Sequence, residues 1–459
     1  MTSLSTPNIS KRPEYAGVLP KDFLYGYASA AYQIEGATSK GGRGPCNWDD
    51  MLADYPDKGD DACRSYDLWE EDIKLLKQYG SRSYRFSVSW SRIKPLGGKD
   101  DPVNEDGIKY YNSLINGLIA AGIEPTITLY HYDTPLPLDK HYRGFAAANP
   151  KELIEDFVSY SKVCFERFGD RVKRWLTINE PWIFASLGAE GLVKNYSRRD
   201  FFLQVPLSSG NKSLLTRYHT RVGHNSLLVH GYVAQLYRVH FQKAQGGQIG
   251  IALNYDWAEP LNNSPEAVKA AEISEARSLG CFSINHYGTM YTTGKQLAPN
   301  TATHFREFDD IQKTLYKDGV LIGRRGENGH PHTVPWGFRN LLVHCWETYA
   351  KELNIPVIVY ENGYAVEHES KMELKDVIND EYRQEFYNLY IGALCDAVKD
   401  HGVWMTGYHC WSLLDNLEWN NGYAPRFGVT YIDRENGYKR IPKDSAKVVA
   451  DIWDHVTRK

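Results

Sequence analysis

Short apolar runs alternate with longer amphipathic segments along almost the whole chain. A short apolar run between turn residues is typical of a buried strand, and apolar residues spaced three and four apart are typical of a helix. The runs predict eight strands, at residues 23–28, 84–88, 125–130, 174–178, 249–254, 282–287, 356–360 and 405–411. Helical patterns lie between them, at residues 65–80, 107–122, 151–169, 264–280, 337–354 and 381–402.

This alternation of strands and helices predicts an α/β protein with a parallel sheet. Eight strands could form either an open doubly wound sheet or a closed barrel. No glycine-rich phosphate-binding motif follows an early strand, and polar residues follow many strands rather than one switch point. We therefore expect a single (β/α)8 TIM barrel, with residues 1–459 in one domain; α/β barrels with long loops reach this length.

Polar, acidic and aromatic side chains stand at or just beyond the ends of most predicted strands. They are Gln33, Arg85, His131, Asn179, Glu180, Asn285, Tyr287, Glu361, Trp411, Glu418 and Trp419. Each one alone is an ordinary residue for a strand end. In a closed barrel, however, the carboxyl ends of all strands converge on one face, which carries the active site. Their coincidence therefore indicates a functional site.

Two glutamates in this set suggest a reaction. Glu180 follows the fourth strand and Glu361 the seventh, so a small barrel places them across from each other. Glycoside hydrolysis needs such a pair: one carboxylic acid protonates the leaving oxygen, and the other attacks the anomeric carbon or activates water. A separation of roughly 5–5.5 Å gives retention and about 6.5–9.5 Å gives inversion, a distance that the sequence leaves open. Either glutamate could instead form an ion pair at the barrel rim.

Composition excludes some partners. The 53 basic and 57 acidic residues give a net charge of −4, without the basic field that nucleic acids or acidic membranes require. There is no apolar run of about 18 residues that could span a membrane. The first residues, MTSLSTPNISKRPEYAG, lack the apolar core of a secretory signal, so we expect a cytoplasmic protein.

The cysteine and aromatic content says less about the function than the strand-end residues do. None of the seven cysteines forms a CxxC pair, which favours reduced thiols over a disulfide framework. The 12 tryptophans and 32 tyrosines could stack on sugar rings, or simply fill a core.

Seven separated blocks of sequence carry a resemblance to a known family. They are FLYGYASAAYQIEGA, YRFSVSWSRIKP, PTITLYHYDTP, RWLTINEPW, INHY, VIVYENGY and GYHCWSLLDNLEWNNGYAPRFGVTYID. In this order they resemble glycoside hydrolase family 1, the β-glucosidase family, and most of all its intracellular fungal members. The resemblance covers about residues 23–453. It implies a (β/α)8 barrel and retaining hydrolysis of β-glucosides such as cellobiose, cello-oligosaccharides and aryl or alkyl glucosides, without a metal or other cofactor.

The resemblance also implies roles for the residues at the strand ends. Glu180 would be the general acid/base and Glu361 the nucleophile, so the pKa of Glu180 should be raised. Gln33, His131, Asn179, Glu418 and Trp419 would hold the non-reducing sugar above Trp411, and Arg85, Asn285 and Tyr287 would support Glu361. A glutamate rather than a glutamine at position 180 implies an O-glycosidase, and Glu418 argues against a phosphorylated sugar because its charge would repel the phosphate.

The chain also departs from the family pattern. A stretch usually present between the helix at 264–280 and the strand at 282–287 is missing, so that the helix runs through Gly280 almost directly into the strand. Tyr360 replaces a small residue before the nucleophile, Tyr132 replaces a tryptophan, and the loop 188–200 lacks its usual motif. Three hypotheses remain: an active β-glucosidase, a carbohydrate-binding barrel that no longer catalyses, or a β-galactosidase or β-fucosidase.

Overall fold

Eight parallel strands form a closed barrel in the computed structural model, which describes residues 7–190, 212–277, 283–294 and 311–459. In chain order the strands are β1 (Leu24–Ala28), β2 (Ser83–Ser87), β3 (Glu124–Thr128), β4 (Arg174–Asn179), β5 (Gln248–Asn254), β7 (Ser283–Asn285), β14 (Val357–Asn362) and β15 (Met405–Trp411). Each strand pairs with the next, and β15 pairs with β1 to close the ring. The predicted barrel is therefore confirmed, and all eight predicted strands overlap observed ones; residue 282 lies outside the described residues.

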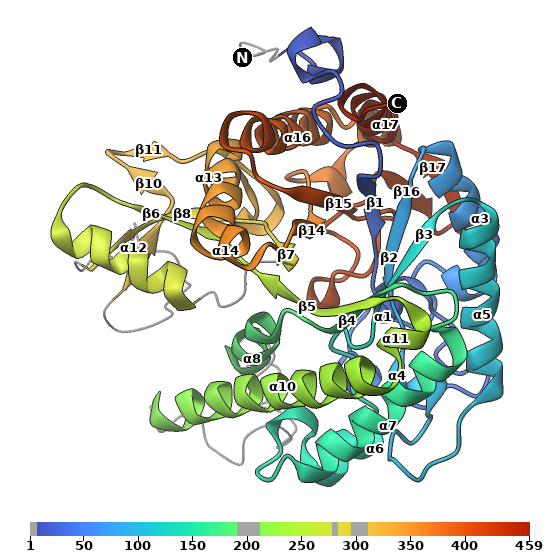
Figure 1. Ribbon diagram of the computed structural model, residues 1–459. Helices are drawn as coiled ribbons and strands as arrows, with labels where there is room; N and C mark the ends of the chain where they lie inside the picture. The colour runs from blue at the N-terminus through green and yellow to red at the C-terminus, as the bar shows by residue number, and fades with distance from the viewer. Residues whose placement is uncertain (1–6, 191–211, 278–282, 295–310) are drawn as a thin grey trace.

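Helices surround the barrel (Figure 1). The long ones are α3 (Ser65–Gln78), α5 (Glu105–Ala120), α7 (Lys151–Phe168), α10 (Lys212–His240), α13 (Pro335–Cys345), α16 (Glu381–His401) and α17 (Asp444–Val456). Local sequence sets their ends: the Asn104 side chain caps the first turn of α5, and Gly402 ends α16 with a positive φ of 65°. Each helix places its apolar face against the barrel, as α5 does with Ile108, Ile115 and Leu118.

Shorter elements fill the loops. They are α1 (Ala31–Ile34), α2 (Asn47–Met51), α4 (Trp90–Ile93), α6 (Leu136–Tyr142), α8 (Pro181–Glu190), α11 (Gln242–Gln245), α14 (Lys351–Leu353), α15 (Leu374–Asn379), β10 (Tyr316–Lys317), β11 (Val320–Leu321), β12 (Arg324–Arg325), β13 (His332–Thr333), β16 (Thr430–Asp433) and β17 (Lys439–Pro442). Several of them lie in the loops that follow barrel strands, where they shape the catalytic face.

The shortened junction between β5 and β7 still closes the barrel. It contains β6 (Trp257–Pro260) and α12 (Pro265–Arg277), and α12 packs on a small sheet of β6, β8 (Thr289–Thr293) and β9 (Gln312–Thr314). This unit extends to one side of the barrel (Figure 1). The predicted helix at 264–280 is thus present, but it does not lie over β5 and β7; its last residues, including Gly280, lie outside the described residues.

The outer face of β5 shows the consequence. Ala252 points into the barrel, where it packs with Leu176 and Tyr360, so its neighbours Ile251 and Leu253 point outward. Both are only half-buried, whereas every residue of β2 and β14 is buried. The barrel is therefore closed by hydrogen bonds at this position while its outer apolar layer is thinner.

A β-bulge in β14 determines how Tyr360 and Glu361 are placed. The register of β14 against β7 shifts between Val359 and Glu361. Bulges re-aim side chains, and this one allows neighbouring residues to serve the interior and the active site. Tyr360 fills the barrel interior, and Arg174 and Glu124, at the amino ends of β4 and β3, are among the charges acting on its hydroxyl. The bulky phenol thus points away from the catalytic end.

Candidate active site

One amide connects the two glutamates at the carboxyl end of the barrel. Asn285, the last residue of β7, donates a hydrogen bond from Nδ2 to Glu180 Oε1 at 3.0 Å. A hydrogen bond from Asn285 also lowers the pKa of Glu361, and the charge of Glu361 raises that of Glu180. Both carboxyl groups therefore lie within reach of one side chain, as a pair acting on one bound molecule requires.

Glu361 is held by a cation and a phenol. It forms a buried ion pair with Arg85 of β2, and the Tyr287 hydroxyl donates to Glu361 Oε2 at 2.9 Å. Burial raises the pKa of Glu361, and Arg85 opposes that rise most strongly, followed by Tyr287. Arg85 also donates to Asn179 Oδ1 at 2.7 Å, so the guanidinium is fixed on two sides. The ionised form of Glu361 is thus supported although the side chain is buried.

Glu180 has a different environment. It is buried, with 7% of its surface exposed, and burial raises its pKa to about 8, helped by the charge of Glu361. Tyr132 and Asn285 donate hydrogen bonds that only partly oppose this rise. Its φ of 41° lies in the left-handed region, a strained conformation for a non-glycine residue that recurs at active sites. Two carboxyl groups with such different surroundings can take the roles of acid and nucleophile.

Beside the glutamates lies a polar and aromatic wall, which consists of Gln33, His131, Trp411, Glu418 and Trp419. Gln33 Nε2 donates to Glu418 Oε2 at 3.3 Å, and the rings of Trp411 and Trp419 each lie 5.8 Å from the ring of His131. Gln33 Oε1 and His131 Nδ1 are buried and have no hydrogen-bond partner among the described residues. Buried polar atoms are rarely left unpaired, so these two are suited to bind the hydroxyls of a ligand.

Direct contacts join nine of the eleven predicted residues into one network, while Gln33 and Glu418 are hydrogen-bonded to each other and Glu418 directly precedes Trp419 in the chain. Asn179 connects the two halves, because its Nδ2 contacts His131 Nε2 at 3.2 Å and its Oδ1 accepts from Arg85 and Asn285. The sequence argument grouped these residues but missed Phe184, whose ring stacks on Tyr132 at 5.8 Å. Phe184 lies in α8 after Glu180, and no pattern in the sequence indicated that it faces the site.

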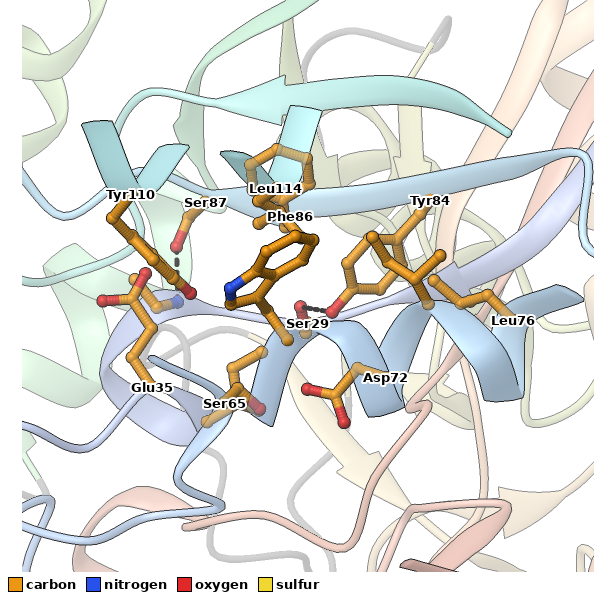
Figure 2. A pocket seen from close by; sticks show the side chains of 14 residues that line it. Ser29, Glu35, Ser65, Asp72, Leu76, Tyr84, Phe86, Ser87, Tyr110 and Leu114 are labelled. Carbon is orange, nitrogen blue, oxygen red and sulfur yellow. Dashed lines mark hydrogen bonds between the residues drawn. The ribbon is translucent and has the colours of Figure 1, made fainter. Parts of the chain in front are cut away.

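A separate small cavity lies on the outer side of the barrel, between β1, β2 and the helices α3 and α5 (Figure 2). Its volume is about 10 Å³, which is room for about one water molecule. Glu35 and Asp72 line it, but Arg92 pairs with Glu35 and Arg440 pairs with Asp72. This cavity is too small to hold a sugar, and neither Glu180 nor Glu361 lines it.

In the parts of the chain that the structure describes, no group of three His, Cys, Asp or Glu side chains is placed to hold a metal ion. No helix in the described ranges is long and apolar enough to cross a membrane. The six described cysteines are buried and form no disulfide with one another, and Cys281 lies outside the described residues together with most of the loop 188–200.

Comparison with known proteins agrees with this geometry. The family model "Glycosyl hydrolase family 1" matches residues 15–318 and 276–456. Beta-glucosidase 1B from Phanerodontia chrysosporium is 41% identical over 471 residues, covering 94% of this chain and 85% of the relative. Beta-glucosidase 25 from Oryza sativa subsp. japonica is 38% identical over 480 residues, covering 94% and 93%.

Comparison with solved structures also identifies β-glucosidases as similar proteins. A GH1 beta-glucosidase from the fungus Humicola insolens, in complex with glucose, superposes with a TM-score of 0.86 at 36% identity, covering 96% of this chain and 99% of that one. The beta-glucosidase from Trichoderma harzianum gives a TM-score of 0.85 at 36% identity, with 98% and 99% covered. The family and enzyme class predicted from the sequence are confirmed. The chain belongs to glycosyl hydrolase family 1, whose members are retaining O-glycoside hydrolases.

Proposed function

We propose that this protein is a retaining β-glucosidase in which Glu361 is the nucleophile and Glu180 the general acid/base. The observation that carries the proposal is the contrast between the two carboxyl groups. Arg85 and Tyr287 support the charged form of Glu361, while burial raises the pKa of Glu180 to about 8. Near neutral pH, Glu180 therefore holds the proton that the leaving group needs.

The reaction then follows in two displacements. Glu361 attacks the anomeric carbon as Glu180 transfers its proton to the glycosidic oxygen, and the C–O bond to the aglycone breaks. In the intermediate, the carboxyl group of Glu361 forms an ester with the anomeric carbon and no longer carries a negative charge. The pKa of Glu180 therefore falls, and its carboxylate can accept a proton from water. That water attacks the same carbon, which releases the sugar with its original configuration and restores both glutamates.

The sugar is held by the polar and aromatic wall in this proposal. Gln33 and Glu418 are hydrogen-bonded neighbours and can bind vicinal hydroxyls, His131 Nδ1 is free to bind a further hydroxyl, and Trp411 offers an aromatic face to the ring. Asn179 sits between Arg85 and Asn285, where it can contact the 2-hydroxyl. The fungal relative solved in complex with glucose supports glucose as the bound sugar.

Several finer points remain predictions. Cellobiose, cello-oligosaccharides and aryl or alkyl β-glucosides are the expected substrates, and residues 1–459 are expected to act as one domain in the cytoplasm. The hypothesis of an inactive barrel depended on the short junction and on Tyr360. Two observations count against this hypothesis: the strand ring is closed, and Tyr360 lies inside the barrel toward the amino ends of the strands, away from the catalytic end.

A fluorosugar experiment tests the proposal. Incubation with 2,4-dinitrophenyl 2-deoxy-2-fluoro-β-glucoside should add one fluoroglucosyl group to the intact mass, and peptide mapping should locate it on Glu361. Glu361→Gln is the control and should add none. Specific activities on nitrophenyl glucoside, galactoside and fucoside then separate the glucosidase from its epimeric alternatives. An unlabelled wild-type protein without turnover would refute catalysis.

A further inference from the structure

Tyr132 is a buried tyrosine that the proposed mechanism does not use. It lies beyond the end of β3, and its hydroxyl donates a hydrogen bond to Glu180 Oε2 at 2.7 Å. The other oxygen of that carboxyl group, Oε1, accepts from Asn285 at 3.0 Å. Each carboxyl oxygen of Glu180 therefore accepts a hydrogen bond, one from Tyr132 and one from Asn285.

The direction of the Tyr132 hydrogen bond is fixed by its neighbours. Arg85 can only donate, so the oxygen of the Asn179 amide faces Arg85, at 2.7 Å. The nitrogen of the same amide then faces Tyr132 and donates to its hydroxyl oxygen at 3.1 Å. A phenol has one proton, and with its oxygen already accepting from Asn179, that proton is directed to Glu180.

The ring of Tyr132 is also fixed. It stacks on Phe184 at 5.8 Å with an angle of 6° between the planes, and it lies 5.3 Å from the ring of Trp419. Its φ of 73° is in the left-handed region, which non-glycine residues adopt only where the surroundings hold them there. The hydroxyl is thus aimed at the carboxyl group by the fold rather than by the hydrogen bond alone.

We propose that Tyr132 is a positioning residue that orients the carboxyl group of Glu180 and stabilises its ionised form. The proposal rests on Glu180 being the acid/base. A donor to a carboxylate favours the charged state, which develops as Glu180 gives its proton to the leaving oxygen. The chain Arg85–Asn179–Tyr132–Glu180 also places the cation that supports the nucleophile at the start of the hydrogen bonds that orient the acid.

Tyr132→Phe removes the hydroxyl and keeps the stacked ring. A hydrogen bond to a carboxylate stabilises its charged form, so loss of this donor should raise the pKa of Glu180. The alkaline limb of the kcat/KM profile should therefore move up by about half to one pH unit. Because a weaker acid protonates poor leaving groups less well, kcat/KM for an alkyl glucoside should fall about tenfold, while that for a dinitrophenyl glucoside should stay within about twofold.

Tyr130→Phe is the matched control. Tyr130 is also buried near the end of β3, and its hydroxyl forms a hydrogen bond with the Thr134 hydroxyl at 2.8 Å. This variant should leave both the alkaline limb and the ratio between the two substrates unchanged. If Tyr132→Phe behaves like Tyr130→Phe, or lowers activity on both glucosides equally, Tyr132 only fills space and the proposal is wrong.

A second measurement does not depend on turnover. The side-chain carboxyl carbon of Glu180, assigned by its loss in Glu180→Gln, can be titrated by 13C NMR in wild-type protein and in Tyr132→Phe. An upward shift of its pKa in the variant supports the proposal even if wild-type protein hydrolyses no glucoside, in which case the proposed function alone fails. An unchanged titration overturns the role of Tyr132 whatever the activity.

Discussion

Glu361 is the residue on which covalent catalysis depends in the proposed mechanism. Glu361→Gln preserves the shape of the side chain but removes the charge that pairs with Arg85. Loss of a nucleophile of this kind lowers kcat by about four orders of magnitude or more. Steady-state assays with a nitrophenyl glucoside should show this loss, while circular dichroism should remain that of the folded protein. A variant that keeps a tenth of the activity would assign the nucleophile elsewhere.

Glu180 and Glu361 together should give a bell-shaped dependence of kcat/KM on pH. Glu180 must be protonated in the free enzyme, so activity is present below its pKa and is lost as pH rises through about 8. Glu361 must be ionised, so activity is also lost as pH falls through its own pKa. The profile should be measured with an alkyl glucoside, whose leaving group needs the acid. In Glu180→Gln the alkaline limb should disappear; a limb that persists unchanged would belong to another group.

The sequence could predict which residues meet, because the ends of barrel strands converge wherever the strands are correctly placed. Gln33 and Glu418 are far apart in the chain, yet they form a hydrogen bond. What the sequence could not provide is the pairing of individual atoms. That Tyr132 donates to Glu180 follows from the orientation of the Asn179 amide, which only three-dimensional neighbours determine.

A buried ionic network holds the loop after β15 to α17. Lys443, next to the start of α17, contacts Glu369 at 2.6 Å and Asp415 at 2.9 Å, and all three are buried. Asp415 lies in the segment that leads to Glu418. Lys443→Met would leave two carboxylates without this cation, so the free energy of unfolding in urea should fall by about 3–5 kcal/mol.

Lys447→Met is the control for this network. Lys447 lies in the same helix and pairs with Asp451, but its side chain is 79% exposed. Such surface pairs contribute at most about 1 kcal/mol. Equal urea midpoints for the two variants would contradict a stabilising role for Lys443.

Elements with local signals were predicted best. The strand at 405–411 matches β15, because an apolar run buried in a parallel barrel needs no knowledge of its partners. The helix expected at 337–354 is instead divided: α13 ends at Cys345, a π-helical turn covers Trp346–Ala350, and α14 follows. A π-helical turn changes which backbone groups hydrogen-bond to each other but hardly changes the spacing of apolar residues along the chain, so the hydrophobic pattern does not reveal it. The small sheet of β6, β8 and β9 was missed because β6 and β8 pair across the intervening helix α12.

At the scale of the whole molecule, the barrel is not uniform around its circumference. β2 pairs with β3 along its full length, whereas among the described residues β5 pairs with β7 only through Leu253 with Ile284 and Asn254 with Asn285. The helix that precedes β7 packs on β6 and β8 instead of on this part of the barrel. The proposed mechanism nevertheless depends on this position, because Asn285 ends β7 and donates a hydrogen bond to Glu180.

The local stability of β5 should therefore be lower than that of β2. Amide exchange reports local opening, which is favoured where few apolar contacts cover a strand. In hydrogen–deuterium exchange mass spectrometry, peptides covering 248–254 should exchange faster than peptides covering 83–87, since Ile251 and Leu253 are half-buried while all of β2 is buried. A bound glucoside that contacts Asn285 should slow exchange in β7 and β5 more than in β2, because ligand binding favours the closed state. Equal protection of the two strands without ligand would show that the short junction costs the barrel no local stability.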